Sequence, residues 1–230
     1  MTLFPRICLA VALLSVTVLA VTVLAQSSPQ SEPEWLSGIR KAAEQENAAT
    51  QYKLGLSYFN GAGVPQDYAE AAKWFRKAAE QGHADAQSDL GRMYYQGKGV
   101  PQDYAEAAKW YHKAAEQGRS GAQGILGFMY YSGRGLPQDY AEAAKWNRRA
   151  AERGIAPAQY MLGLSHFHGA GVPQDYIQAH LFANLAAASV TREERKEFAK
   201  LRDQIAAKMT PEQIAEAQRL AREWKPGPAK

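Results

Sequence analysis

The sequence of 230 residues contains a single cysteine, Cys8, which lies in the apolar stretch at its N-terminus. Beyond that stretch there is no thiol, so the chain forms no internal disulfide and offers no thiolate to a metal. A large charge of either sign is missing as well. The formal net charge of +4 is too small to indicate nucleic-acid binding, which depends on neutralising many phosphates.

The five histidines do not form a set of metal ligands. His166 and His168 are two residues apart, so on one helix their side chains diverge and cannot both bind one ion. The other three, His83, His112 and His180, lie at unrelated places in the sequence. We therefore expect no metal site and no cofactor.

The sequence also lacks the patterns of familiar active sites. No strand pattern precedes a glycine-rich turn, which is the context that a phosphate-binding loop requires. No serine, lysine and general base stand at a spacing that indicates a hydrolase. Carboxylates occur at every predicted helix start, where capping and the helix dipole already explain them. We therefore do not expect an enzyme.

The first 25 residues have the pattern of a secretory signal peptide. Arg6 supplies a positive charge, residues 7–25 are almost entirely apolar, and small residues precede Gln26. Cleavage after Ala25 would leave a protein without a membrane span, periplasmic or secreted, with a polar linker over residues 26–33. The alternative is an uncleaved anchor facing the periplasm from the inner membrane, because a helix over residues 7–25 would be about 28 Å long and could just span a bilayer.

One sequence motif recurs four times along the rest of the chain, at a period of 36 residues. Its Leu-Gly pair begins at Leu54, Leu90, Leu126 and Leu162. Its Pro-Gln-Asp-Tyr segment occupies residues 65–68, 101–104, 137–140 and 173–176. A fixed period of this size is typical of stacked helix pairs.

Residues 83–118 show what one unit contains. Apolar spacing predicts a helix over residues 84–95 and a second over residues 103–117, separated by a loop with two glycines and a proline. Asp103 and Glu106 predict a capping box at the start of the second helix. Gly118 predicts that this helix ends with a glycine in the left-handed conformation. Gly91 stands in mid-helix, where glycine costs about 1 kcal/mol, so we expect a neighbouring side chain or backbone to approach closely there.

The fold class predicted from these units is all-α, a right-handed α-solenoid of helix pairs with helical caps. The predicted organisation is a capping half repeat with Trp35 and Ile39 turned inward (34–46), four repeats (47–82, 83–118, 119–154, 155–190), a terminal helical hairpin covering the fourth repeat (191–225) and a tail (226–230).

The motif Gly97-x-Gly99-Val100-Pro101-Gln102-Asp103-Tyr104, with the segment Lys113-Ala114-Ala115-Glu116-Gln117-Gly118, resembles the Sel-like repeat family. The resemblance extends from about Asn47 to Ser189. It implies an α-helical solenoid related to tetratricopeptide repeats, with a longer loop inside each pair, and a role as a protein–protein adaptor or scaffold. Many bacterial members are exported. A cysteine-rich subgroup is described as penicillin-binding or β-lactamase-like, but its disulfides are missing here.

A comparison of the four copies with one another separates packing positions from variable ones. The second helix of each unit is nearly constant, whereas one stripe of the first helix changes. Its positions hold Tyr52, Ser88, Gly124 and Tyr160; Lys53, Asp89, Ile125 and Met161; Leu56, Arg92, Phe128 and Leu164; and Asn60, Gln96, Ser132 and His168. Packing demands repeat with the period, so we expect the changing stripe to lie outside the packing, on the concave surface of the solenoid.

The candidate binding residues are therefore Tyr52, Leu56, Arg92, Ile125, Phe128, Tyr160, Met161 and Leu164, with the focus on the apolar third and fourth units. The expected function is that of an exported adaptor that binds a protein or peptide in the cell envelope. Alternatives are a secreted binder of a host or extracellular protein, a structural part of an envelope assembly, and an enzyme of the β-lactamase or cell-wall hydrolase class. Another is that the C-terminal hairpin itself covers the stripe. The sequence leaves the partner and the oligomeric state open.

Overall fold

The computed structural model describes residues 34–45 and 47–227. The chain divides after Ile39 into two compact parts, and the part from Arg40 onward holds nearly all the described residues. The predictions that fall outside the described residues and side chains are the signal peptide (1–25), the linker (26–33), the last residues of the tail (228–230) and the inward orientation of Trp35 and Ile39.

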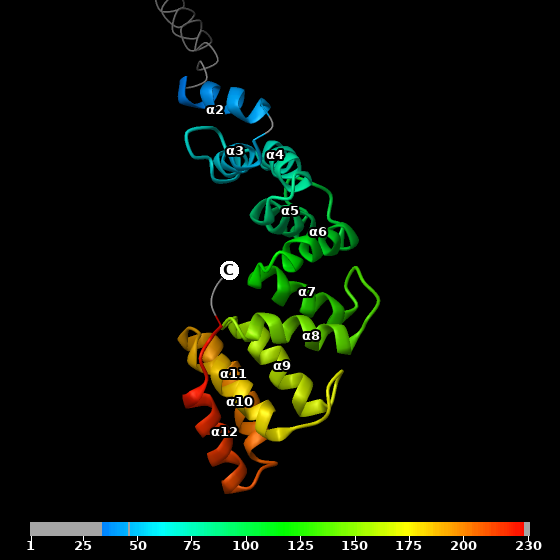
Figure 1. Ribbon diagram of the computed structural model, residues 1–230, viewed down its shortest axis with the longest axis vertical. Coiled ribbons are helices and arrows are strands. Elements are labelled where there is room, and N and C mark those ends of the chain that lie inside the picture. The colour runs from blue at the N-terminus through cyan, green and yellow to red at the C-terminus, as the bar shows by residue number, and fades with distance from the viewer. Residues whose placement is uncertain (1–33, 46, 228–230) are drawn as a thin grey trace, which may run out of the picture. The chain divides into compact units, whose positions relative to one another are not determined.

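Every element in the described part of the chain is a helix, as predicted (Figure 1). The first is α2 (Glu34–Glu44), and the last two are α11 (Arg192–Ala206) and α12 (Pro211–Glu223). Between them lie four pairs: α3 (Ala48–Asn60) with α4 (Tyr68–Glu80), α5 (Ala84–Gln96) with α6 (Tyr104–Glu116), α7 (Ser120–Ser132) with α8 (Tyr140–Ala151), and α9 (Ala156–His168) with α10 (Tyr176–Ala188).

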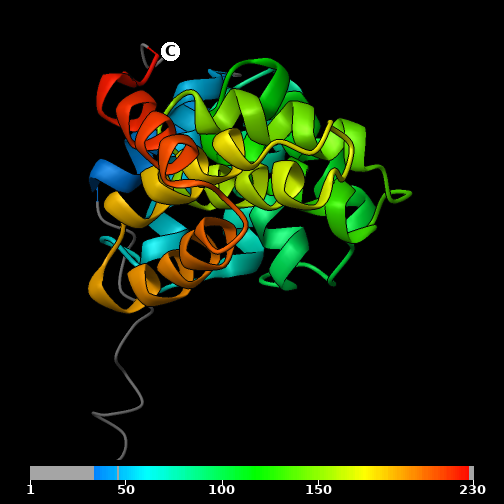
Figure 2. The same ribbon diagram turned by 90° about the horizontal axis from the view of Figure 1, so that it is seen from below.

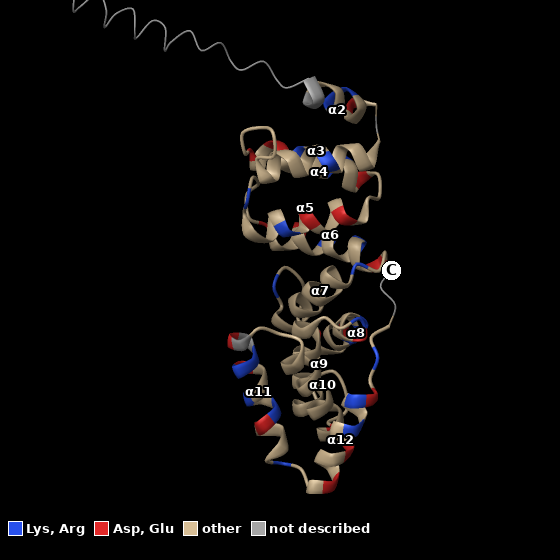
Figure 3. Cartoon of the chain, turned by 90° about the vertical axis from the view of Figure 1, so that its left-hand side faces the viewer, with Lys and Arg blue, Asp and Glu red and all other residues tan. Residues whose placement is uncertain are grey.

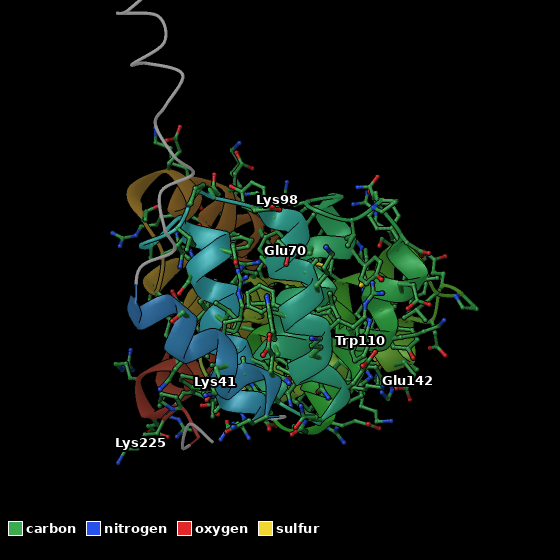
Figure 4. The ribbon with its side chains drawn as sticks, turned by 90° about the horizontal axis from the view of Figure 1, so that it is seen from above. Lys41, Glu70, Lys98, Trp110, Glu142 and Lys225 are labelled. Atoms are coloured by element: carbon green, nitrogen blue, oxygen red, sulfur yellow. The ribbon has the colours of Figure 1, made fainter. Side chains whose placement is uncertain are left out.

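The pairs stack in chain order to form the solenoid. The two helices of each pair pack on each other, and each second helix packs on the first helix of the next pair. Figure 1 and Figure 3 show this succession from α3 to α10. Buried tryptophans, among them Trp110 (Figure 4), belong to the constant second helices.

The residues predicted to cap the second helix of the unit at residues 83–118 do so, with one exception. Asp103 caps α6, because its Oδ1 accepts hydrogen bonds from the amides of Ala105 at 2.9 Å and Glu106 at 3.0 Å. The reciprocal half of the predicted capping box is wrong, since the Glu106 carboxylate pairs with Lys109 instead. The physical reason is that the Asp103 amide already donates to the carbonyl of Tyr94, in the last turn of α5, at 3.0 Å.

The mid-helix glycines mark close approaches, as the sequence indicates. A Cβ added at Gly91 would lie 3.2 Å from the ring of Tyr111 and 3.3 Å from the carbonyl oxygen of Ala107. At Gly55 the same atom would lie 2.5 Å from the ring of Phe75. The helices of one pair therefore pack at a distance that alanine would not allow without displacing the neighbour.

Buried glutamines join each unit to the preceding one. The amide nitrogens of Gln51, Gln87, Gln123 and Gln159 donate to the carbonyls of Ala43, Ala79, Ala115 and Ala151, respectively. Each carbonyl lies near the C-terminal end of the helix before it, where the last backbone acceptors have no partner within the helix. The constant glutamine of the motif thus caps the preceding unit.

The last two helices cover the fourth pair from two sides. Both α11 and α12 pack on α10, and Figure 2 and Figure 3 show them lying apart on either side of it. Leu201 and Ile205 of α11 are buried against Ala179 and Ala183, whereas Leu220 of α12 packs on a different core cluster. The terminal helices therefore straddle α10, each with its own apolar contact.

Candidate binding groove

An apolar groove of about 550 Å³ opens between the first helices of successive pairs and α11. Of the predicted binding residues, the groove brings together Arg92, Ile125, Phe128, Tyr160 and Met161. They come from α5, α7 and α9, so residues far apart in the sequence lie along one surface because the pairs stack in register. Phe128 is 37% exposed, one of two large hydrophobic side chains that remain exposed in the described part of the chain.

Several lining residues were not among the predicted ones. Gly124 is in the changing stripe, but a glycine has no side chain by which sequence comparison could assign it to a binding surface. Ile155 and Pro157 lie at the start of α9, outside the positions compared. Phe198 comes from α11 and forms part of the groove wall. No periodic signal could place Phe198, because it lies beyond the last repeat.

Tyr52 lies in a separate, polar pocket of about 390 Å³ that shares only Gly121 with the apolar groove. Its hydroxyl donates to the Asp89 carboxylate at 3.0 Å. Burial, together with the negative charge of Asp89, raises the pKa of Tyr52 to about 12. Asp85 pairs with Arg119 across the same pocket. This end of the stripe is therefore held by polar contacts between neighbouring repeats.

The alternative that the C-terminal helices cover the stripe holds for its last part. The ring of Tyr160 stacks on Phe198, with centroids 4.7 Å apart and an interplanar angle of 21°. Leu164 packs against the buried cluster that includes Leu201 and Ile205. Leu56, the remaining predicted residue, is half-buried and lines neither the groove nor the polar pocket. Helix α11 therefore closes the stripe at Leu164, whereas Met161 and Tyr160, whose ring stacks on Phe198, still line the groove.

The rim of the groove is basic. Among the lining residues the only charged side chain is Arg92, which pairs with Asp89 at 2.8 Å. Arg134 lies close by, with its guanidinium carbon 5.9 Å from the centroid of the Phe128 ring. Arg134 also donates to the Tyr95 hydroxyl at 2.7 Å. A segment bound in the groove would therefore meet an apolar floor beside positive charge.

The Sel1 repeat model matches four segments, residues 48–83, 84–118, 120–155 and 156–189, which together make up more than half of the chain. The chain belongs to the Sel1 repeat family. Proteins of Sel1 repeats are scaffolds that typically mediate protein–protein interaction. Comparison with curated protein sequences finds no match.

Two solved structures with this Sel1 repeat architecture are similar to the chain. One is c5321, a protective antigen of uropathogenic Escherichia coli with an SLR fold, at 43% identity and a TM-score of 0.64 over 69% of this chain. The chain spans 34% of the length of that protein. The other is a Sel1 repeat protein from Oxalobacter formigenes, at 33% identity and a TM-score of 0.64. The match covers 78% of this chain and 72% of that protein.

Two further features concern the described residues of this Sel1 repeat chain. No group of three or more histidine, cysteine, aspartate or glutamate side chains in that part could hold a metal ion. None of the helices found there is both long and apolar enough to cross a membrane.

The fourth Sel1 repeat carries a buried histidine where the others have tyrosine. Arg40 of α2 donates to the hydroxyl of Tyr58 in the first repeat, and Tyr94 of the second repeat accepts from Arg76 in the same way. The residues equivalent to Arg40 and Tyr58 at the fourth repeat are Arg148, on α8 of the third repeat, and His166. Both ring nitrogens of His166 are buried without a hydrogen-bond partner. Burial lowers the pKa of His166, and the positive charge of Arg148 lowers it further.

The substitution His166→Tyr is expected to stabilise this Sel1 repeat protein and to make its stability less dependent on pH. A lowered pKa in the folded state means that the unfolded chain binds the proton first as the pH falls below about 6.5. Stability is therefore lost on acidification from that point, by at most about 1.4 kcal/mol per pH unit for one group. Tyrosine does not titrate there and can accept a hydrogen bond from Arg148.

Urea unfolding of both proteins between pH 7.5 and 5 measures this difference. Some slope should remain in the variant, because burial also lowers the pKa of His180. If the free energy of unfolding changed equally with pH in the two proteins, His166 would be solvated in the folded state.

Proposed function

We propose that this protein is an exported adaptor that binds a protein or peptide partner through the apolar groove between α7, α9 and α11. The observation that supports it most is the position of Phe128, which is 37% exposed although it lies among apolar neighbours. An isolated exposed side chain would need no explanation. An exposed phenylalanine in an apolar groove of about 550 Å³ is typical of a surface that another protein covers.

The shape of the groove suits a chain segment. Ile125 and Phe128 project from α7 and Met161 from α9, so a segment laid across them would contact two successive repeats at once. Helical and extended peptides are recognised in such grooves by side chains that enter apolar depressions at regular spacing. The rim cations would fix the orientation of the segment more than they would add to its affinity.

The proposed site of action is the periplasm or the outside of the cell. The support for export is the pattern of residues 1–25, a charged start followed by an apolar stretch and small residues before Gln26. We expect N-terminal sequencing of the chain recovered from the cell envelope to begin at Gln26. A start at Met1, in protein extracted only with detergent, would support the anchored alternative. A secreted role toward a host or extracellular protein would use the same groove.

The test of the proposed groove is a matched pair of substitutions. Phe128→Asp places a charge in the groove, and we expect capture of the partner by the tagged protein to fall by at least about tenfold. Tyr140→Asp is the control, because Tyr140 is the other exposed large hydrophobic residue, at 41%, and lies outside the groove. Equal capture by both variants, with unchanged circular dichroism, would place the binding surface elsewhere.

We further propose that the chain works by binding and not by catalysis. The groove is lined by apolar side chains, tyrosine hydroxyls, the Gln96 amide and one arginine, and its lining includes no histidine, carboxylate, lysine or cysteine to act as a general base near neutral pH. Turnover of nitrocefin or of muropeptides by the purified chain, abolished by Phe128→Asp but not by Tyr140→Asp, would contradict this.

A further inference from the structure

One position of the changing stripe is filled by an aromatic ring in two repeats and empty in a third. In the first repeat the ring of Tyr52 stacks on His83, with centroids 4.6 Å apart and an interplanar angle of 28°. In the fourth, Tyr160 stacks in a similar way on Phe198. The third repeat has Gly124 at this position, and Gly124 lines the groove. The groove thus coincides with a place where the repeat elsewhere carries a ring.

We infer that the partner supplies the missing ring: an aromatic side chain of the bound segment occupies, over Gly124, the place that Tyr52 fills in the first repeat. The inference rests on the proposed function and specifies the chemistry of the occupant. The first repeat shows that such a ring fits between the first helix of one unit and the start of the next. It also packs near a second ring, since the centroids of Tyr52 and Phe75 lie 5.6 Å apart.

The neighbours of the empty position show which aromatic residue fits it. On the side of the second repeat the Tyr52 ring meets polar residues, and the Tyr52 hydroxyl donates to Asp89 at 3.0 Å. The residue that stands to Gly124 as Asp89 stands to Tyr52, 37 residues further along the chain, is Met161 of the fourth repeat. A thioether is a weak acceptor, so a phenolic hydroxyl would lose its partner on entering the groove. The occupant is therefore phenylalanine in preference to tyrosine.

The residues equivalent to His83 and Asp85 point to the same preference. They are Ile155 and Pro157, and both line the groove. A ring over Gly124 would therefore lie on an aliphatic surface at every side where the Tyr52 ring meets an imidazole or a carboxylate. At these three positions a change from polar to apolar neighbours accompanies the loss of the repeat's own ring, whereas Phe75 corresponds to the buried Asn147.

Charge indicates what should flank the phenylalanine. The lining contains Arg92 and no carboxylate, and Arg92 already pairs with Asp89. Arg134, beside Phe128, contacts aromatic rings, and within the described part of the chain no carboxylate pairs with it. An acidic residue next to the partner's phenylalanine would supply that carboxylate. The occupant is thus a segment of a partner protein that carries a phenylalanine with an acidic neighbour.

The test uses short acetylated peptides with one phenylalanine between two glutamates and glycine at the ends. Binding is measured from the methyl resonances of Ile125, Ile155 and Met161 in the full chain. We expect the phenylalanine peptide to bind at least about tenfold more tightly than its alanine counterpart, and measurably more tightly than its tyrosine and lysine-flanked counterparts. No shift of these resonances, or equal affinity of the phenylalanine and alanine peptides, would overturn the inference.

A substitution in the protein gives an independent result. Gly124→Tyr restores the repeat's own ring, and we expect it to abolish binding of the phenylalanine peptide. The position tolerates a side chain, because an added Cβ would lie 3.6 Å from Ile155 and 3.7 Å from Ala158, which is ordinary contact. The control is Gly121→Ala, whose Cβ would meet no atom within 4 Å. Undiminished binding by a folded Gly124→Tyr variant would contradict the inference, and the peptide series decides if that variant fails to fold.

The inference and the proposed function can fail separately. If a partner crosslinks to Phe128 through a segment that has no aromatic residue, the function stands and the inference is wrong. If the phenylalanine peptide binds but no protein crosslinks at Phe128 in cells, the inference stands for the groove as a site and the adaptor function does not.

Discussion

Replacing Gly135 with alanine is expected to lower the free energy of unfolding by about 3 kcal/mol or more. Gly135 has a φ of +75°, where an L-residue with a Cβ costs about 1–2 kcal/mol. The added Cβ would also overlap the carbonyl oxygen of Tyr104, in the preceding repeat. A backbone oxygen cannot turn away as a flexible side chain does, so the loop of the third repeat would have to leave the second.

Gly82→Ala separates the two costs. Gly82 has a φ of +87°, yet an added Cβ would meet no atom within 4 Å. We therefore expect this variant to lose only the conformational part, about 1–2 kcal/mol. The comparison is made by urea unfolding followed by circular dichroism. Equal losses in the two variants would show that the loop does not pack on the preceding repeat.

Leu164→Asp is expected to be the most damaging change in the stripe, with a loss of about 3–5 kcal/mol. Leu164 packs against Ala183, Leu201 and Ile205, so the substitution removes apolar contacts and leaves a carboxylate without a partner among them. We expect α11 to detach from the fourth repeat. From sequence alone, Leu164 and Phe128 belong to one binding surface, and charge at either would abolish only binding.

Phe128→Asp is the matched control for that prediction. The Phe128 side chain is 37% exposed and belongs to none of the buried clusters in the described part of the chain, so its replacement should change stability by less than about 1 kcal/mol. Thermal unfolding of the two variants, with proteolysis to detect release of α11, checks the difference. Comparable losses in both would mean that Phe128 is part of the core.

The repeat architecture could be predicted because its signals are local. The cap at Asp103, the left-handed turn at Gly118 and the close contact at Gly91 each depend on residues within one unit. The capping box that begins α12 is local in the same sense, because it joins Thr210 to Gln213, three residues further along the chain. Such features follow from the geometry of helix ends and crossings, which the sequence specifies over a few residues.

The groove was only partly predictable because it depends on contacts that the period does not encode. A position that fails to repeat can face a partner, as proposed for Phe128, or face the cap, as Leu164 does. Sequence comparison treats the two alike. The position of Phe198 depends on how α11 packs on α10 beyond the last repeat, and Gly124 matters through the side chain that it lacks.

The most direct measurement of the central claim is photocrosslinking in living cells. A photoreactive residue is placed at Phe128, in the groove, and separately at Lys109 on α6, whose side chain is 66% exposed. We predict one discrete crosslinked band from Phe128, lost when Met161→Asp is added, and no such band from Lys109. Bands of equal intensity from both positions, or none from Phe128 in a folded and exported chain, would contradict the account.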